Sequence, residues 1–206
     1  MNAVFLCDES GIMAAPWAEA GFDCLCIDLQ HSIRADRTEG RITYRWGDVR
    51  SLTPADIPAP SFLCAMPPCT HLAVSGARDF ARKGLRALIE SLEIVEACRI
   101  LCEWFGCPWM LENPVSTLAS YWRKPDYTFQ HWNYGDLNRK KTCLWTGGGF
   151  VMPEFMFTKE PAGVESKTWL MSPSDDRAKL RAKTPEGFAR AVFQANRGIA
   201  ERKAAA

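Results

Sequence analysis

The sequence predicts an α/β protein of the Rossmann-like type, with a mostly parallel sheet and helices on both faces. Two observations lead to this fold class. Short apolar runs typical of buried strands alternate along the chain with segments of helical periodicity. Several of these runs stop abruptly at Asp, Glu, Gly or Pro, as strands do where they enter turns. With 206 residues, the chain is long enough for one sizeable domain with a small appendage.

The front of the chain predicts a strand, a helix and a second strand. Residues 3–7 form an apolar run that ends in Asp8, and residues 13–20 show a helical pattern that Gly21 terminates. Residues 23–29 form a second apolar run that closes on Asp28. Residues 41–46 alternate in polarity and predict a third strand, which a turn at Asp48 follows.

The middle of the chain continues the alternation. Residues 54–60 contain three prolines and predict a loop, and residues 61–66 predict a fourth strand that Pro67 stops. The longest helical pattern covers residues 79–104, and a fifth strand is predicted at 108–111, ended by Asn113 and Pro114. A short helix at 116–122 and a strand at 143–146 follow. Thr184 and Pro185 then have the pattern of a capped helix start.

Composition indicates an ordinary water-exposed globular protein with reduced thiols. The formal net charge is +1, so the overall charge predicts neither a nucleic-acid coat nor a binder of acidic surfaces. No apolar run approaches the roughly 18–20 residues of a membrane span. No signal-peptide pattern opens the sequence, so we expect the nine cysteines to be free in a cytoplasm. We expect Cys98, Cys102 and Cys107 to be buried core residues, with a bound metal or cluster as the alternative.

The ends of the predicted strands are where a ligand site is expected, because parallel sheets bind ligands at the carboxyl ends of their strands. Acidic side chains follow the first three strands at Asp8, Asp28 and Asp48. A carboxylate at such a place accepts hydrogen bonds from ribose hydroxyls or from an adenine amino group. Aspartate is also common at strand ends because it stabilises turns, so this signal alone is weak.

Two further strand ends carry a possible nucleophile and a possible proton donor. Cys69 follows two prolines that stiffen the backbone, at a position where a thiolate can be exposed and stabilised. Glu112 follows an apolar strand directly, and burial there would raise its pKa and let it donate a proton. The pair predicts nucleophilic catalysis.

From about Val4 to Gly147 the order of these segments resembles the cytosine-C5 DNA methyltransferase family, in a compact form of the kind found in phage genomes. Cys69 in MPPCT resembles the family's Pro-Cys nucleophile motif, and Glu112 in LENP resembles its Glu-Asn-Val motif. The segment that begins at Tyr134-Gly135 resembles the one that contacts the target base, with Arg139 and Lys141 at its arginine positions.

The resemblance also implies a cofactor and a fold. It implies S-adenosylmethionine bound by a class I methyltransferase fold, with Ser10 and Gly11 in the first cofactor loop. Asp28 would hold the ribose and Asp48 the adenine, and Asp8 and Pro67 would complete the binding site. Met13 and Ala14 stand where the family has further glycines in this loop. No metal is implied.

The implied organisation has three parts: a cofactor-binding and catalytic core at 1–147, an irregular lid or reduced recognition segment at 148–183, and a C-terminal helix at 184–206. The stretch between Gly147 and Thr184 is too short for the large target-recognition domain of the family. The resemblance implies DNA, read with little sequence specificity, as the first expected substrate. The missing recognition domain would permit a free pyrimidine nucleotide as the second. A degenerate protein that only binds DNA or cofactor is the third alternative. The sequence predicts no membrane partner and leaves the oligomeric state open.

Overall fold

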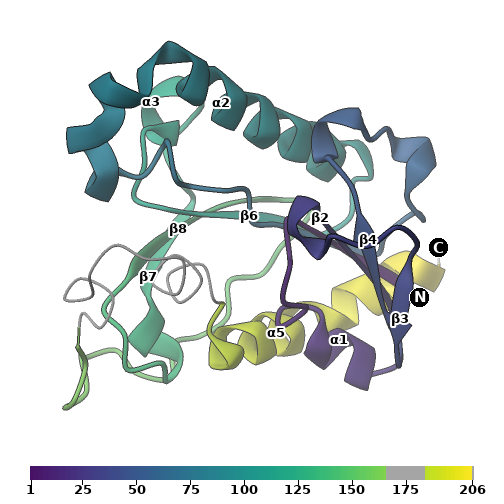
Figure 1. The fold of residues 1–206 in the computed structure, drawn as a ribbon. Helices are drawn as coiled ribbons and strands as arrows, with labels where there is room; N and C mark the ends of the chain where they lie inside the picture. The colour runs from purple at the N-terminus through teal and green to yellow at the C-terminus, as the bar shows by residue number, and fades with distance from the viewer. Residues whose placement is uncertain (166–183, 206) are drawn as a thin grey trace.

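The computed structural model describes residues 1–165 and 184–205 and shows an α/β fold built on one mixed, mostly parallel sheet. Helices α2 (Phe80–Trp104) and α3 (Leu118–Tyr121) lie on one face of the sheet, and α1 (Ala15–Glu19) and α5 (Glu186–Ala205) lie on the other (Figure 1). The predicted α/β fold with a mostly parallel sheet and helices on both faces is confirmed, and it is consistent with the Rossmann-like type.

The sheet has eight strands in the order β3-β4-β2-β1-β5-β6-β8-β7. The strands β4, β2, β1, β5 and β6 are neighbours and run parallel. If these five parallel strands are numbered 1 to 5 by their place in the chain, their order across the sheet is 3-2-1-4-5, that of a doubly wound sheet. The strands are β1 (Asn2–Leu6), β2 (Asp23–Asp28), β3 (Arg37–Glu39), β4 (Ile42–Trp46), β5 (Phe62–Ala65), β6 (Trp109–Pro114), β7 (Tyr127–Gln130) and β8 (Lys141–Gly147).

The strand β6 is longer than the sequence predicts. It was expected to end before Asn113 and Pro114, but it runs to Pro114, which pairs with Thr142 of the antiparallel strand β8. A proline is tolerated at a strand end, where its missing N–H removes no ladder hydrogen bond that the sheet needs. Glu112 therefore lies inside a hydrogen-bonded strand, opposite Leu144, and not in a turn after it.

Two hydrophobic cores, one on each face, hold the sheet between its helices. On the face covered by α1 and α5, Trp17 stacks on Phe62 with ring centroids 4.2 Å apart. On the face covered by α2, the buried residues include Cys98, Cys102 and Cys107. These cysteines are core residues as predicted, and all nine cysteines of the chain are free thiols.

The helix α2 departs from the predicted regular helix in its first turns. Gly84 has φ 75° and ψ 179°, a conformation that breaks the helix and that a residue with a Cβ adopts only with strain. The side chains of Leu85 and Ile89 are exposed just after the break, whereas Val95 and Leu101 are buried further along. The expected apolar stripe therefore faces the core only over the later turns, where α2 packs on β5 and β6.

The described part of the predicted lid, residues 148–165, is anchored to the core. The side chain of Asn196 in α5 accepts a hydrogen bond from Val151 N (2.8 Å) and donates one to Val151 O (2.9 Å). Tyr134 donates its hydroxyl hydrogen to Pro153 O at 2.9 Å. The rest of the predicted lid, residues 166–183, lies outside the described residues.

Candidate active site

Three acidic residues follow three adjacent parallel strands and so share one edge of the sheet. Asp8 follows β1, Asp28 ends β2, and Asp48 follows β4. Because β1, β2 and β4 are hydrogen-bonded neighbours in parallel register, the carboxylates line the carboxyl edge of half the sheet. The structure thus brings together the acidic residues that the sequence singled out.

Asp8 is almost completely buried, with 2% of its surface exposed. Its Oδ1 accepts hydrogen bonds from Ser10 Oγ (3.0 Å) and Gly11 N (2.9 Å). Its Oδ2 makes no hydrogen bond to any described residue. Burial raises the pKa of this carboxyl, and the hydrogen bonds from Ser10 and Gly11 only partly oppose that effect. An unpartnered carboxylate oxygen at a ligand-binding edge is a strong acceptor for a donor or a cation.

Gly11 is required for the tight turn that follows. Its φ is +69°, and a Cβ at this position would lie 2.5 Å from the hydroxyl oxygen of Tyr44 on β4. The loop therefore passes directly against the next strand but one in the sheet. Met13 and Ala14, which replace the expected glycines, are fully buried and begin the packing of α1 on the core.

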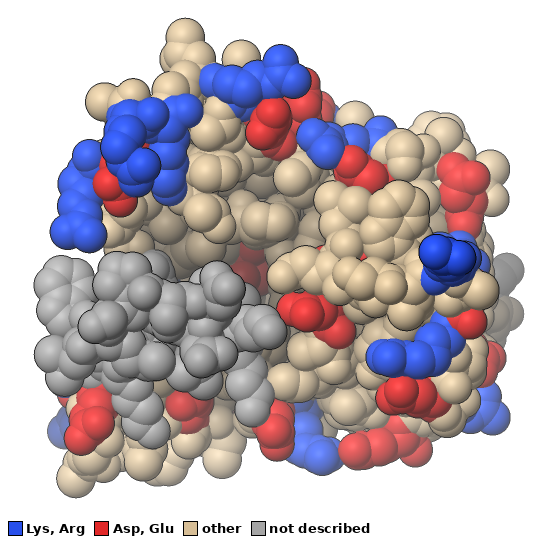
Figure 2. Space-filling view, viewed as in Figure 1, with Lys and Arg blue, Asp and Glu red and all other residues tan. Residues whose placement is uncertain are grey.

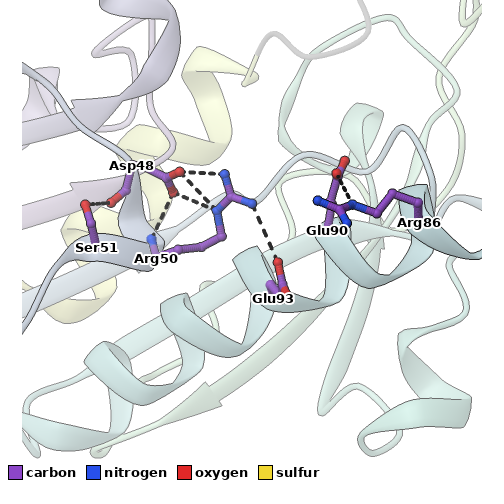
Figure 3. Close-up of polar contacts among 6 residues, drawn as sticks. All are labelled: Asp48, Arg50, Ser51, Arg86, Glu90 and Glu93. Carbon is purple, nitrogen blue, oxygen red and sulfur yellow. Dashed lines mark hydrogen bonds and ion pairs between the residues drawn. The ribbon is translucent and has the colours of Figure 1, made fainter.

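The other two aspartates are held by local contacts. Asp28 caps the short helix η1 (Leu29–His31), where its Oδ1 accepts a hydrogen bond from Gln30 N at 2.7 Å. Asp48 accepts hydrogen bonds from the guanidinium of Arg50, at 2.9 Å and 3.0 Å from Nε, and this contact lowers the pKa of the Asp48 carboxyl. Arg50 also reaches Glu93 of α2 at 3.6 Å (Figure 3). A ligand that uses Asp48 has to compete with Arg50.

The Pro-Pro-Cys turn and the end of β6 are tied together. The strands β5 and β6 are parallel neighbours, and the side chain of Asn113 donates a hydrogen bond from Nδ2 to Pro67 O at 3.1 Å. After the turn, Cys69 O accepts from Leu72 N (3.0 Å) and Ala73 N (2.9 Å), which closes the loop beyond the cysteine. The cysteine itself is half-buried. Pro67 is buried beneath it, at the C-terminal end of β5.

A narrow pocket of about 10 Å³, room for about one water molecule, lies beside Glu112 and is partly open to solvent. Glu112 and Lys140 face each other across it, with Lys140 Nζ 4.0 Å from Glu112 Oε1 and both side chains less than a quarter exposed. Cys69 is not one of the described residues that line this pocket. The lining is half apolar and half polar and consists of Met66, Glu112, Phe129, His131, Lys140, Thr184, Pro185 and Phe188.

The basic side chain nearest Glu112 in the pocket is that of Lys140. Arg139 and Lys141, which were expected to contact the target base, do not line the pocket. Arg139 forms an ion pair with Glu160, with Nε 3.1 Å from Oε2. Lys141 is the exposed first residue of β8. Successive side chains of an extended chain point in opposite directions, so a shift of one position changes which one faces the pocket.

Sequence reasoning also missed His131. It belongs to the short helix η5 (His131–Tyr134), only 2% of it is exposed, and it lines the pocket with Glu112 and Lys140. Burial lowers the pKa of its imidazole, while the nearby carboxylate of Asp136 acts in the opposite direction. A lone histidine in a turn has no periodic signal, so only the fold shows that it belongs to this pocket.

Basic side chains gather beside the loop that follows Cys69. The helix η4 (Val74–Asp79) and the start of α2 expose Arg78, Arg82 and Arg86, whose side chains are 85%, 77% and 86% exposed. Figure 2 shows Lys and Arg side chains along the upper edge of this face, above a hollow at its centre. All three of these arginines are paired with carboxylates, Arg78 and Arg82 with Asp79 and Arg86 with Glu90, which reduces the net positive charge.

No protein-family model matches this chain, and no curated protein matches it. Within the described residues, no group of three or more His, Cys, Asp and Glu side chains is placed to hold a metal ion. None of the helices in the described ranges combines the length and apolarity needed to cross a bilayer.

Proposed function

We propose that this protein transfers a methyl group from S-adenosylmethionine to C5 of cytosine in DNA through a covalent adduct of Cys69. The observation that carries the proposal is the hydrogen bond from Asn113 Nδ2 to Pro67 O. It ties the loop that holds Cys69 to the strand that holds Glu112, so a nucleophile and a proton donor approach one site from neighbouring strands.

The sheet topology supports a methyltransferase. The parallel strands have the order of a Rossmann-like sheet, but the antiparallel strand β8 lies between β6 and β7. An antiparallel strand inserted at this place distinguishes class I methyltransferase sheets, the fold that the resemblance implies, from dinucleotide-binding sheets.

The acidic edge of the sheet fits the cofactor. The unpartnered Oδ2 of Asp8 suits the cationic amino group of its methionine part. Asp28 at the end of β2 would accept hydrogen bonds from the ribose hydroxyls. Asp48 would accept one from the adenine amino group once its hydrogen bond from Arg50 is broken. S-adenosylmethionine would supply the methyl group at this edge.

Glu112 and Lys140 of the pocket, together with Cys69 on the adjacent loop, would provide the chemistry that a pyrimidine needs. C5 of cytosine is a poor nucleophile until a thiolate adds to C6, so the Cys69 Sγ–C6 bond must form first. Glu112 would protonate or hydrogen-bond N3 and draw charge away from the ring during this addition. Lys140, and not the expected Arg139 or Lys141, lies next to Glu112 and would hold the O2 edge.

The exposed arginines favour DNA over a free nucleotide as the substrate. Arg78, Arg82 and Arg86 lie in η4 and the first turns of α2, so three exposed cationic side chains follow the Cys69 loop. DNA phosphates would have to displace Asp79 and Glu90 from them. A polymer with a phosphate at each residue matches such a row of cations. In duplex DNA the target base has to be flipped out, because stacking blocks the face that the thiolate attacks.

The test is transfer of labelled methyl groups from S-adenosylmethionine to DNA and, separately, to dCMP. We expect label in DNA with the wild-type protein and none with Cys69→Ser. With DNA that contains 5-fluorocytosine, the wild-type protein should form a covalent adduct that survives denaturation of the protein. Thermal melting of Cys69→Ser checks that the variant is folded. Label in dCMP alone would replace DNA with a nucleotide substrate. Absence of both transfer and cofactor binding would leave only a binding protein without catalysis.

A further inference from the structure

His131 is a buried, polar group in the Glu112 pocket to which the reaction described above assigns no role. Its ring packs nearly parallel to Phe129, with centroids 6.2 Å apart, and its backbone N–H donates to Lys140 O at 3.2 Å. These contacts place His131 beside Phe129 and Lys140 on the pocket wall. A buried histidine that also lines a pocket is a candidate for proton transfer.

Asp136 is positioned to orient this imidazole. Its Oδ2 lies 3.6 Å from His131 Nδ1, slightly beyond hydrogen-bond distance. A carboxylate at Nδ1 favours the tautomer with the hydrogen on that nitrogen and leaves Nε2 as the basic nitrogen. It also stabilises the imidazolium that forms when Nε2 takes a proton.

The charges around His131 come from three parts of the chain. Asp136 lies just beyond η5, Glu112 comes from β6, and Lys140 comes from the segment before β8. The two carboxylates favour the protonated ring, whereas Lys140 and burial disfavour it, and the net effect is a pKa below the ordinary value. The resting imidazole is therefore neutral at neutral pH and can accept a proton.

We propose that His131 is the base that removes the C5 proton after methyl transfer, with Asp136 as its positioning residue. This inference rests on the proposed function. In the adduct, C5 carries both the methyl group and a hydrogen, and C6 is bonded to Cys69 Sγ. Nε2 takes the C5 proton, the C5–H electrons form the C5–C6 double bond, and the C6–S bond breaks. Its electrons return to sulfur, so 5-methylcytosine and the Cys69 thiolate are released while His131 becomes imidazolium.

The experiment measures methyl transfer and release separately, with His131→Gln and ordinary cytosine DNA. Labelled methyl groups should enter DNA that remains attached to the denatured protein, because addition and transfer proceed while elimination is blocked. Release should slow by about 100-fold or more, the usual contribution of a general base. Asp136→Asn should show a smaller accumulation of the same adduct. Release by the wild type should slow as pH falls through the pKa of His131.

The outcomes distinguish this inference from the proposed function. If the wild-type protein neither methylates DNA nor forms an adduct with 5-fluorocytosine DNA, the proposed function fails. If the wild type is active and His131→Gln, folded by thermal melting, releases its product at the wild-type rate, only the role of His131 is overturned. Accumulation of the adduct in His71→Gln instead would assign the proton transfer to the histidine beside Cys69.

Discussion

At the residue scale, the buried carboxylate of Asp8 should lower the free energy of unfolding of the ligand-free protein and raise its affinity for S-adenosylmethionine. Its carboxylate is buried with one oxygen unpartnered by described residues, and its raised pKa shows that burial disfavours the charged form. Asp8→Asn keeps an oxygen to accept from Ser10 and Gly11 and removes the buried charge. We expect the melting temperature at pH 7 to rise, by about 2–4 °C for each kcal/mol regained.

The same substitution should weaken cofactor binding. Calorimetry with S-adenosylmethionine should show at least a tenfold loss of affinity for Asp8→Asn, because a neutral amide cannot pair with an ammonium group. Ser10→Ala is the matched control: it removes a neighbouring hydrogen bond to Asp8 and leaves the charge. Equal affinities for Asp8→Asn and the wild type would show that Asp8 is a structural residue only.

Lys140 should matter more for turnover than the two basic residues on either side of it. Its ammonium group is 4.0 Å from Glu112, whereas Arg139 pairs with Glu160 and Lys141 is exposed. Lys140→Met should lower kcat about 100-fold, the scale of losing one charge-stabilising donor. Lys141→Met should change kcat less than threefold. A larger effect at Lys141 than at Lys140 would mean that the target cytosine binds on the side of residues 139–141 that Lys141 faces.

At the element scale, the turn between β1 and α1 depends on a glycine that packs against β4. Gly11→Ala adds a Cβ where φ is +69° and where the Tyr44 hydroxyl is only 2.5 Å away. The left-handed conformation costs about 1–2 kcal/mol for a residue with a side chain, and the contact adds to it. We therefore expect a loss of unfolding free energy, measured by urea titration, that exceeds 2 kcal/mol.

A double-mutant cycle separates the two causes. Tyr44→Phe removes the hydroxyl oxygen, so Gly11→Ala should cost less in that background. Gly21→Ala is the control for backbone conformation alone, because Gly21 has φ +93° and a Cβ added there would meet no atom of the described residues within 4 Å. Equal costs for Gly11→Ala in both backgrounds would rule out the contact with Tyr44.

How far an element could be predicted depended on its place in the sheet. The central strands β1, β2 and β5 are buried on both faces, so each is a continuous apolar run that the sequence shows to within about a residue. The edge strands β3 and β7 were not predicted. Residues Arg37–Glu39 are polar and exposed, and their pairing is decided by the turn to β4. The strand β7 has only one buried residue, Phe129, so neither edge strand shows the continuous apolar run of a strand covered on both faces.

The candidate site shows the same division. The strand before Cys69 and the strand that holds Glu112 could be recognised from sequence because both are apolar, and they are parallel neighbours in the sheet. Lys140 could not be separated from Arg139 and Lys141, because the side that each faces depends on the register of β8 against β6. His131 and its neighbour Asp136 are joined by the fold of a short turn, which the sequence pattern does not reveal.

At the scale of the whole molecule, the buried histidine links stability to pH. The folded-state pKa of His131 lies below the ordinary value of 6.5, which the unfolded chain keeps. As pH falls through 6.5, the unfolded chain therefore binds a proton that the folded protein does not, and the free energy of unfolding decreases. The limit for one proton is about 1.4 kcal/mol per pH unit. The decrease ends once pH falls below the folded pKa.

Urea unfolding at pH 7.5 and pH 5.5 measures this effect. We expect the wild type to lose stability between these values, and His131→Gln to lose less because it has no imidazole to protonate. His71, whose pKa is also lowered by burial but which is far more exposed, should contribute a smaller part, so His71→Gln should keep most of the wild-type slope. Carboxylates held by arginines, such as Asp36, have lowered pKa values and lose their contribution only in more acidic solution, below the range compared. If the free energy of unfolding changes equally with pH in the wild type and in His131→Gln, the imidazole is solvated in the folded protein. A solvated imidazole would have no lowered pKa, which would remove the reason for it to be the neutral base that accepts the C5 proton.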